Sequence, residues 1–260
     1  MVGLAVRPSL PPKVSGHGNG SGRGDEDRKI AEGEVDRLDR PVTSQTMVEP
    51  APSLSAQLRA QTAPLHARIE TLLGLPASIR SREDYLLWLG RFLGFYEPLE
   101  RALAAFPGWE AFGCALPART QAPCLANDLG ALAADPRQPP RIASELLPAL
   151  PSFSHALGAA YVLEGATLGG RIILRDLEPR MGAALAGATR FFGGRGKATG
   201  PMWQSFQAAL DAFGRAHPGR CADVVTGAQR TFRALLAWFA PFCAVPLRAA
   251  PSRVTRPRQA

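Results

Sequence analysis

The sequence predicts an all-α protein with one folded domain. Apolar residues recur at spacings of three and four over most of residues 54–242, and no segment there shows the apolar–polar alternation of a half-buried strand. The 260 residues are enough for one large domain, and a hydrophobic fraction of 46% is typical of globular proteins. We therefore expect helices packed around a single core within residues 51–247.

The two ends of the chain are expected to be disordered. Residues 1–50 include the charged, Gly/Ser-rich stretch KVSGHGNGSGRGDEDRK, which has almost nothing to bury. Met47 lies just ahead of the first periodic segment and could be the true start of the chain. Residues 248–260 carry four arginines and no acidic residue, which is typical of a basic solvated tail.

The first helix is expected in residues 57–70, QLRAQTAPLHARIE. Five of its residues share one face at helical spacing: Leu58, Thr62, Leu65, His66 and Ile69. Because Pro64 removes a backbone hydrogen bond, this helix should bend there or begin near Thr62.

The second helix is expected in residues 81–103, with Ser81 as its N-cap and two acidic residues in its first turn. Pro98 should bend or end it. The same periodicity predicts further helices from about Gln121 within residues 115–135, and over residues 152–177, 200–216 and 221–242.

Composition excludes several classes of protein. No charged segment followed by an apolar one marks a signal peptide, and no run approaches the ~20 apolar residues of a membrane span. The cysteines form no CxxC pair, which argues against structural zinc and a disulfide framework and favours free thiols in a cytoplasmic protein: Cys114, Cys124, Cys221 and Cys243. The net charge of +8 suits an anionic ligand or an acidic partner protein. Scattered arginines without interleaved aromatic residues do not indicate nucleic-acid binding.

His66 is the most informative histidine. Neutral imidazole is a good ligand for iron or zinc, and a metal-bound histidine usually donates its second ring N–H to a partner such as a carboxylate. Glu70 lies one turn further on, and Arg59, two turns earlier, could meet an anionic group. Taken alone, the segment favours a plainer interpretation, a core or surface histidine paired with Glu70.

Three glycines interrupt an otherwise apolar helix in residues 161–174, YVLEGATLGGRIIL. Each interior glycine costs roughly 0.5–1 kcal/mol relative to alanine. Gly165 and Gly169 share a face, where a flat ligand or another helix could touch the backbone, and the motif alone favours neither. Gly170 follows directly.

A Gly-rich segment precedes the fifth helix, in residues 190–206, RFFGGRGKATGPMWQSF. It carries Arg195 and Lys197, but it does not match the GxxxxGK[ST] phosphate loop and no strand precedes it. A loop between helices with incidental charges explains it equally well.

Together these segments resemble the biliverdin-producing heme oxygenases. LRAQT with its following histidine and glutamate, YVLEGATLGG, and FFGGRG with the later TG, Trp and Phe occur in the family's order and separations. The resemblance covers about residues 54–242 and is nearest to the bacterial branch often paired with bacteriophytochromes. It implies a heme oxygenase-like helical bundle in residues 51–247, with heme between a proximal and a distal helix.

The resemblance also implies roles for the residues singled out above. His66 would ligate the heme iron, Glu70 would hold its ring, and Arg59 would meet a heme propionate. Gly165, Gly169 and Gly170 would bend the distal helix so that O2 contacts backbone. Arg195 and Lys197 would be further propionate contacts.

The implied reaction cleaves heme, which is both cofactor and substrate, with O2 and reducing equivalents to biliverdin, CO and ferrous iron. The implied partners are an electron donor such as a ferredoxin or ascorbate, and a bacteriophytochrome as biliverdin acceptor. Neither nucleic acid nor a membrane is expected as a partner.

The sequence departs from the family at one position. Many heme oxygenases carry an aspartate just ahead of the distal glycine pair to organise water, although the bacterial subgroup lacks it. Here Ala166, Thr167 and Leu168 precede Gly169, and Glu164 should point to another face. Arg171 or backbone carbonyls would then organise the water, and the position of ring opening stays open.

Other functions remain as alternatives. A non-catalytic heme-binding or heme-delivery protein would keep the ligand without the water network. A thiaminase-like enzyme shares the helical architecture but needs a reactive cysteine, for which no setting is visible. A regulatory protein could act through the basic tail. His155 is the second candidate iron ligand, or else a core or cap residue.

Overall fold

The computed structural model describes residues 52–135, 137–185 and 187–244. The chain divides into two units, Met1–Val48 and Glu49–Ala260, and all the described residues belong to the second. The ends that we expect to be disordered, residues 1–50 and 248–260, lie outside the described residues.

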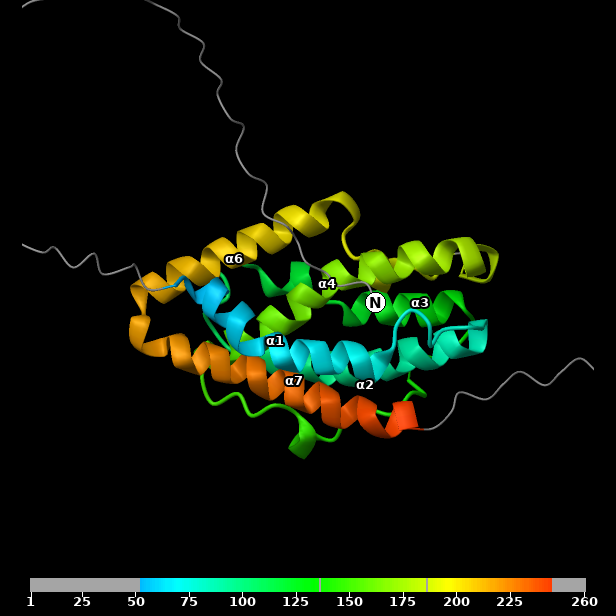
Figure 1. Ribbon diagram of the computed structural model, residues 1–260, viewed down its shortest axis with the longest axis horizontal. Coiled ribbons are helices and arrows are strands. Elements are labelled where there is room, and N and C mark those ends of the chain that lie inside the picture. Colours follow the sequence, from blue (N-terminus) through cyan, green and yellow to red (C-terminus); the bar gives the residue numbers. More distant parts are fainter. Residues whose placement is uncertain (1–51, 136, 186, 245–260) are drawn as a thin grey trace, which may run out of the picture. The chain divides into compact units, whose positions relative to one another are not determined.

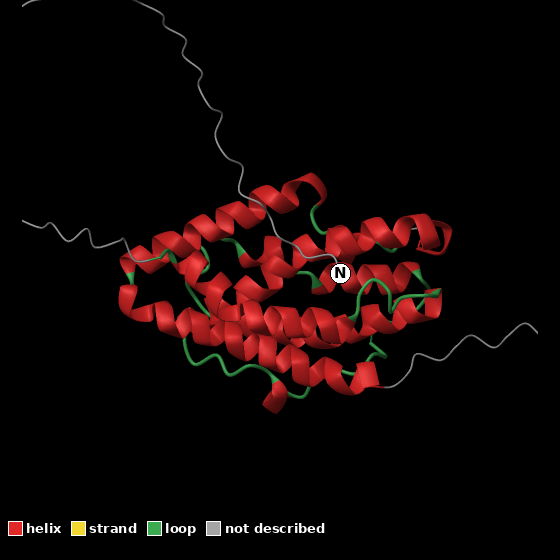
Figure 2. Ribbon diagram, viewed as in Figure 1, coloured by secondary structure: helices red, strands yellow, loops and turns green. Residues whose placement is uncertain are grey.

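Every regular element in the described residues is a helix, which confirms the all-α prediction (Figure 2). The α-helices are α1 (Leu54–Leu73), α2 (Arg82–Ala104), α3 (Ala122–Ala131), α4 (Phe153–Met181), α5 (Arg190–Gly193), α6 (Thr199–Ala216) and α7 (Cys221–Ala244).

Helix α7 supports both α1 and α4. It packs extensively against each of them, and Figure 1 shows α1 and α7 lying side by side. Helix α2 packs on α3, and α6 packs on α4 and α1. The largest side chains that this packing removes from water are aromatic: Trp88, Tyr85, Phe95, Phe192, Phe206 and Phe239.

Helices α4 and α7 cross at two glycines, which let the backbones touch. A Cβ atom on Gly158 would lie 1.9 Å from the carbonyl oxygen of Val224, and one on Gly227 would lie 2.1 Å from that of His155. No side chain fits at either place. The crossing therefore fixes α4 against α7 two turns ahead of Gly165.

Pro64 and Pro98, where the sequence predicted that a helix bends or has a boundary, both lie inside helices. Helix α1 begins at Leu54, ten residues before Pro64, and α2 continues past Pro98 to Ala104. Each proline costs one backbone hydrogen bond and a local clash. The apolar faces on both sides of each proline are buried, as at Leu58 and Ile69 in α1, and this burial outweighs the cost. Of the two outcomes expected at each proline, a helix boundary is therefore excluded, and a bend stays a prediction.

The starts of α2 and α3 lie where the sequence predicted them. Ser81 and Asp84 form a reciprocal capping box at the start of α2, in which each side chain accepts a hydrogen bond from the other residue's backbone N–H. Helix α3 begins at Ala122, with Gln121 as its N-cap residue.

Helix α4 is longer than the sequence predicted. With the following turn it spans Phe153–Leu185, and by length and composition alone this stretch could cross a membrane. Half of its most apolar part is buried inside the domain, and the ionisable side chain of Glu164 is among the buried groups. These contacts identify α4 as a core helix of this bundle.

We expect Gly158→Ala to lower the free energy of unfolding by at least about 2 kcal/mol, because the added methyl group must separate two backbones. Gly130 in α3 is the matched control, since a Cβ atom there meets nothing within 4 Å. Gly130→Ala should leave stability unchanged or slightly raised in urea unfolding. Equal stabilities of the two variants would contradict the backbone contact.

Candidate functional site

His66 stands on the exposed side of α1. Its side chain is 57% exposed, and its Nδ1 atom lies 3.6 Å from Oε2 of Glu70. The edge of the ring packs on Phe232 of α7, with ring centroids 5.9 Å apart and planes at 82°. Because Glu70 lies beside Nδ1, Nε2 is the nitrogen through which this imidazole can bind a metal.

Helices α1 and α4 meet one turn before His66. The Tyr161 side chain on α4 lies close enough to Thr62 and Arg59 of α1 for both to influence its pKa. Burial raises the pKa of Tyr161, and these two residues oppose that rise. Since both helices run in the same general direction from this contact (Figure 1), His66 and Gly165 each lie one turn beyond it.

The three distal glycines have three different environments. A Cβ atom on Gly165 would lie 3.5 Å from the Trp203 ring, and one on Gly170 would lie 3.1 Å from the carbonyl oxygen of Phe192. A Cβ atom on Gly169 would meet nothing within 4 Å. Gly165 and Gly170 therefore pack against other elements of the protein, and Gly169 presents bare backbone.

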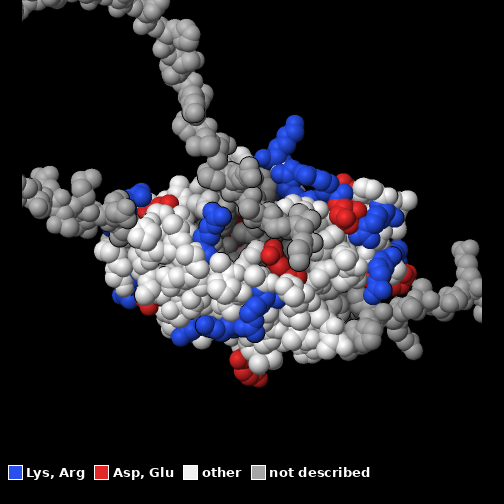
Figure 3. Space-filling view, in the orientation of Figure 1, with Lys and Arg blue, Asp and Glu red and all other residues white. Residues whose placement is uncertain are grey.

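Exposed apolar side chains flank Gly169. Leu168 is 37% exposed and Ile172 is 43% exposed, one turn apart on α4. Figure 3 shows a hollow near the middle of one face, with basic side chains on one side of it and acidic ones on the other. An imidazole on α1 and a bare apolar strip on α4 suit a flat apolar ligand that carries its own metal.

The described residues offer no cluster of protein ligands of the kind that holds a bare metal ion. Among residues 52–244, apart from the two undescribed positions, no three His, Cys, Asp or Glu side chains lie close enough to hold one. Protein sites for zinc use three or four such ligands. A single histidine fits iron whose other ligands come from a macrocycle, and the residues present therefore fit heme.

The other residues predicted for the site differ in accessibility. Arg59, Arg171 and Lys197 are exposed, whereas the Arg195 side chain is only 13% exposed. The Arg195 guanidinium donates to the carbonyl oxygens of Ala118 and Arg119, at 3.2 and 2.6 Å. Its predicted propionate contact stays a prediction, because here the group is engaged by these carbonyls.

His155 does not lie at this site. Its Nδ1 is 2.8 Å from Oγ of Ser152, at the start of α4, and burial lowers its pKa. Because it is buried at the α4–α7 crossing, it is a core residue, one of the roles that the sequence left open. The cysteines are free thiols, as expected: Cys114, Cys124, Cys221 and Cys243.

A buried cluster of charged side chains lies between α4 and two other segments of the chain, and it was not predicted from the sequence. Glu164 is 4% exposed, and its carboxylate pairs with Arg119 at 2.5 Å and with Arg195 at 3.4 Å. A charged residue inside an apolar helix was the available signal. Its partners are 45 and 31 residues away, so no local spacing identifies them.

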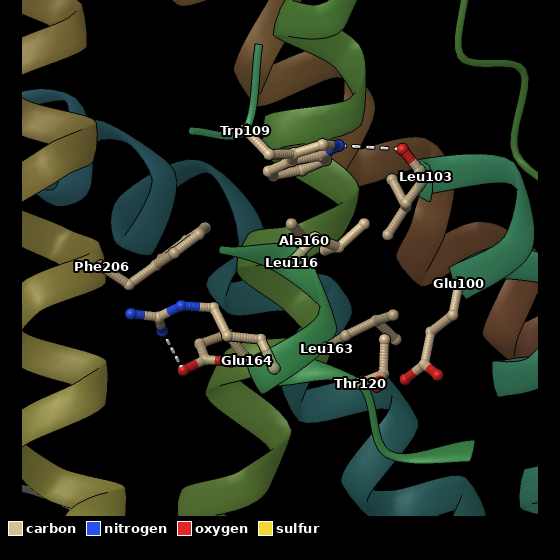
Figure 4. A pocket seen from close by; sticks show the side chains of 10 residues that line it. Glu100, Leu103, Trp109, Leu116, Thr120, Ala160, Leu163, Glu164 and Phe206 are labelled. Atoms are coloured by element: carbon tan, nitrogen blue, oxygen red, sulfur yellow. Dashed lines mark hydrogen bonds and ion pairs between the residues drawn. The ribbon is translucent and has the colours of Figure 1, made fainter. Parts of the chain in front are cut away.

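Glu100 lies on the far side of a small cavity from this pair. The cavity has a volume of about 20 Å³, and Figure 4 shows Glu164 and Glu100 with Leu163 and Thr120 between them. Burial raises the pKa of Glu100 to about 7, although backbone N–H groups of the α3 N-terminus and the Arg195 charge oppose the rise.

Both the sequence and the fold of this chain are similar to those of heme oxygenases. The sequence model of the family described as heme oxygenase matches residues 52–241, most of the chain. This chain belongs to the heme oxygenase family. No curated protein matches it. The fold is similar to a crystal structure of NO- and CO-bound heme oxygenase from Neisseria meningitidis, with a TM-score of 0.61, 18% identity, and coverage of 80% of this chain and 100% of that one.

The family explains the arrangement around α1 and α4. A heme oxygenase binds heme and degrades it to biliverdin, and this one has one exposed imidazole on α1 and one uncovered glycine on α4.

We expect alanine substitutions at Gly169 and Gly170 to have opposite effects on this heme oxygenase. Gly170→Ala should lower the free energy of unfolding by about 1–2 kcal/mol, because its methyl group meets the backbone of Phe192. Gly169→Ala should raise it by about 0.5–1 kcal/mol through helix propensity.

Heme cleavage should show the reverse order. Gly169→Ala should slow cleavage more than Gly170→Ala does at a temperature where both variants are folded, as absorption spectra of the heme complex would show. A Gly169→Ala enzyme as fast as wild type would show that the uncovered backbone has no role at the site.

Proposed function

We propose that this enzyme holds heme between His66 and the Gly169 segment and cleaves it with O2 and reducing equivalents to biliverdin, CO and ferrous iron. One observation carries the proposal: an exposed imidazole at His66 on α1 and an uncovered glycine at Gly169 on α4 both come after the place along their helices where Tyr161 approaches Thr62. Bound heme supplies the redox-active iron that this chemistry requires.

The residues of α1 orient the substrate. His66 binds iron through Nε2, and the Glu70 carboxylate beside Nδ1 favours the tautomer with its proton on Nδ1. Phe232 packs against the ring and limits its rotation. Arg59, two turns before His66, is placed to pair with a propionate.

The residues of α4 control access to the opposite face. Gly169 lets a small molecule approach the backbone, and Leu168 and Ile172 exclude water on either side of it. None of the three residues before Gly169, which are Ala166, Thr167 and Leu168, is an aspartate, so in this proposal Arg171 or backbone carbonyls organise the water that delivers protons. Lys197 is a further propionate contact.

Heme binding without cleavage is the second candidate function, and the observation that favours it is the lack of an aspartate among the three residues before Gly169. A carrier and an enzyme differ in one measurement. With ascorbate under O2, an enzyme loses its Soret band and gains the broad absorption of biliverdin, whereas a carrier keeps its Soret band.

His66→Ala should raise the dissociation constant for hemin by at least about tenfold and abolish cleavage, because the bond from protein to iron is lost. Hemin titration followed by absorption measures both effects, and added imidazole should restore part of the Soret band. His217→Ala is the control, since that exposed histidine follows α6. Wild-type spectra for His66→Ala would exclude His66 as the ligand.

We further propose a cytoplasmic setting, with an acidic ferredoxin-type protein as electron donor and a bacteriophytochrome as biliverdin acceptor. The charge of +8 supports the choice of donor, because complementary charge speeds the encounter of two proteins. The acceptor rests on the sequence resemblance alone.

Turnover with an acidic ferredoxin should fall several-fold as salt rises from about 0.02 to 0.5 M, because salt screens attraction between exposed charges. Ascorbate is the control donor, since a small molecule needs no docking surface. Equal salt dependence with both donors would remove the case for an acidic protein partner.

A further inference from the structure

Glu164 directly precedes Gly165 in the sequence, and its carboxylate is buried against other parts of the chain. The residues that contact it come from two other parts of the chain. Arg119 ends the turn η1 (Leu116–Arg119), and Arg195 lies in the loop between α5 and α6. One buried charge thus ties the distal helix to two separate segments.

Arg119 extends this tie to α6. Besides Glu164, its guanidinium donates to the carbonyl oxygen of Met202 at 3.2 Å and to Oγ of Ser205 at 3.0 Å. Trp203, between these two residues in sequence, is the side chain that covers Gly165. The contact between Gly165 and α6 is therefore held in place by hydrogen bonds from Arg119.

Arg195 ties the other end of the glycine segment. Its loop packs on α4 at Gly194, where a Cβ atom would lie 3.5 Å from the carbonyl oxygen of Thr167. The hydroxyl of Thr167 in turn donates to the carbonyl oxygen of Glu164 at 2.7 Å. The turn of α4 that precedes Gly169 thus packs against the loop that carries Gly194 and Arg195.

We propose that Glu164 is a positioning residue for heme cleavage: through Arg119 and Arg195 it fixes the distal glycine segment at one distance from the bound heme. The inference rests on the proposed function. Glu164 does not touch heme, and its effect reaches the site through the place and tilt of α4. A helix with three glycines in six residues has little stiffness of its own, so these lateral ties set its position.

Two variants distinguish an effect on the position of α4 from an effect of the Glu164 charge. Arg119→Lys keeps the charge, but a single ammonium cannot reproduce the guanidinium contacts with Glu164, Met202 and Ser205. Glu164→Gln keeps the shape and removes a negative charge. The readout is the pH midpoint at which the absorption spectrum of the ferric heme complex changes from its acid to its alkaline form.

We expect both variants to bind hemin stoichiometrically and to shift this midpoint in the same direction by about 0.5 unit or more, because each releases the same segment. If Glu164 acted only as a charge, Arg119→Lys would leave the midpoint unchanged. If the cluster were only structural, melting temperatures would fall and neither midpoint would move. Either result would overturn the proposal.

The matched control is Arg82→Lys. Arg82, the first residue of α2, donates to the carbonyl oxygen of Leu132 at 2.7 Å, so this bond joins α2 to the end of α3 and involves neither α4 nor α6. It should lower stability without moving the midpoint. If Glu164→Gln does not fold, Arg119→Lys decides the question alone. Failure of the wild-type protein to bind hemin would instead refute the proposed function.

Discussion

The site depends on the packing of α7 against both α1 and α4. Helix α7 meets α4 backbone to backbone at Gly158 and Gly227, and it meets α1 through side chains that include Phe232 under His66. Direct contact between α1 and α4 is weaker, and the approach of Tyr161 to Thr62 is one part of it. The spacing of α1 and α4, which carry His66 and Gly169, is thus set mainly by a third helix, which carries none of the proposed ligands.

The sequence predicted the helices well because apolar periodicity reports which face of a helix is buried. It left open whether a helix boundary lies at Pro64 or Pro98, as a local rule about proline allows, and neither helix has a boundary there. The burial that keeps both helices continuous comes from other helices, so it is visible only after folding. The capping box at Ser81 was predictable because both of its members lie within four residues.

Some features of the site could likewise be predicted from nearby residues, and others depend on distant parts of the chain. His66 and Glu70 are one helical turn apart, and their pairing follows from spacing alone. The glycines show the limit of such reasoning. Gly165, Gly169 and Gly170 are the same residue in one short motif, yet Trp203 covers the first, the Phe192 backbone lies against the last, and only Gly169 is uncovered. Which glycine can meet a ligand depends on α5 and α6.

Apolar packing and buried charges have different effects on α4. Buried ion pairs often add little stability, because removing charge from water costs about as much as pairing returns. Glu164 with Arg119 and Arg195 is therefore a weak explanation for why the bundle is stable, and the apolar packing on α7 is a better one. What a charged pair does provide is direction, since a carboxylate meets a guanidinium in few geometries. An apolar crossing holds α4 in the fold, and a directional charged contact two turns further on determines where its glycine segment lies.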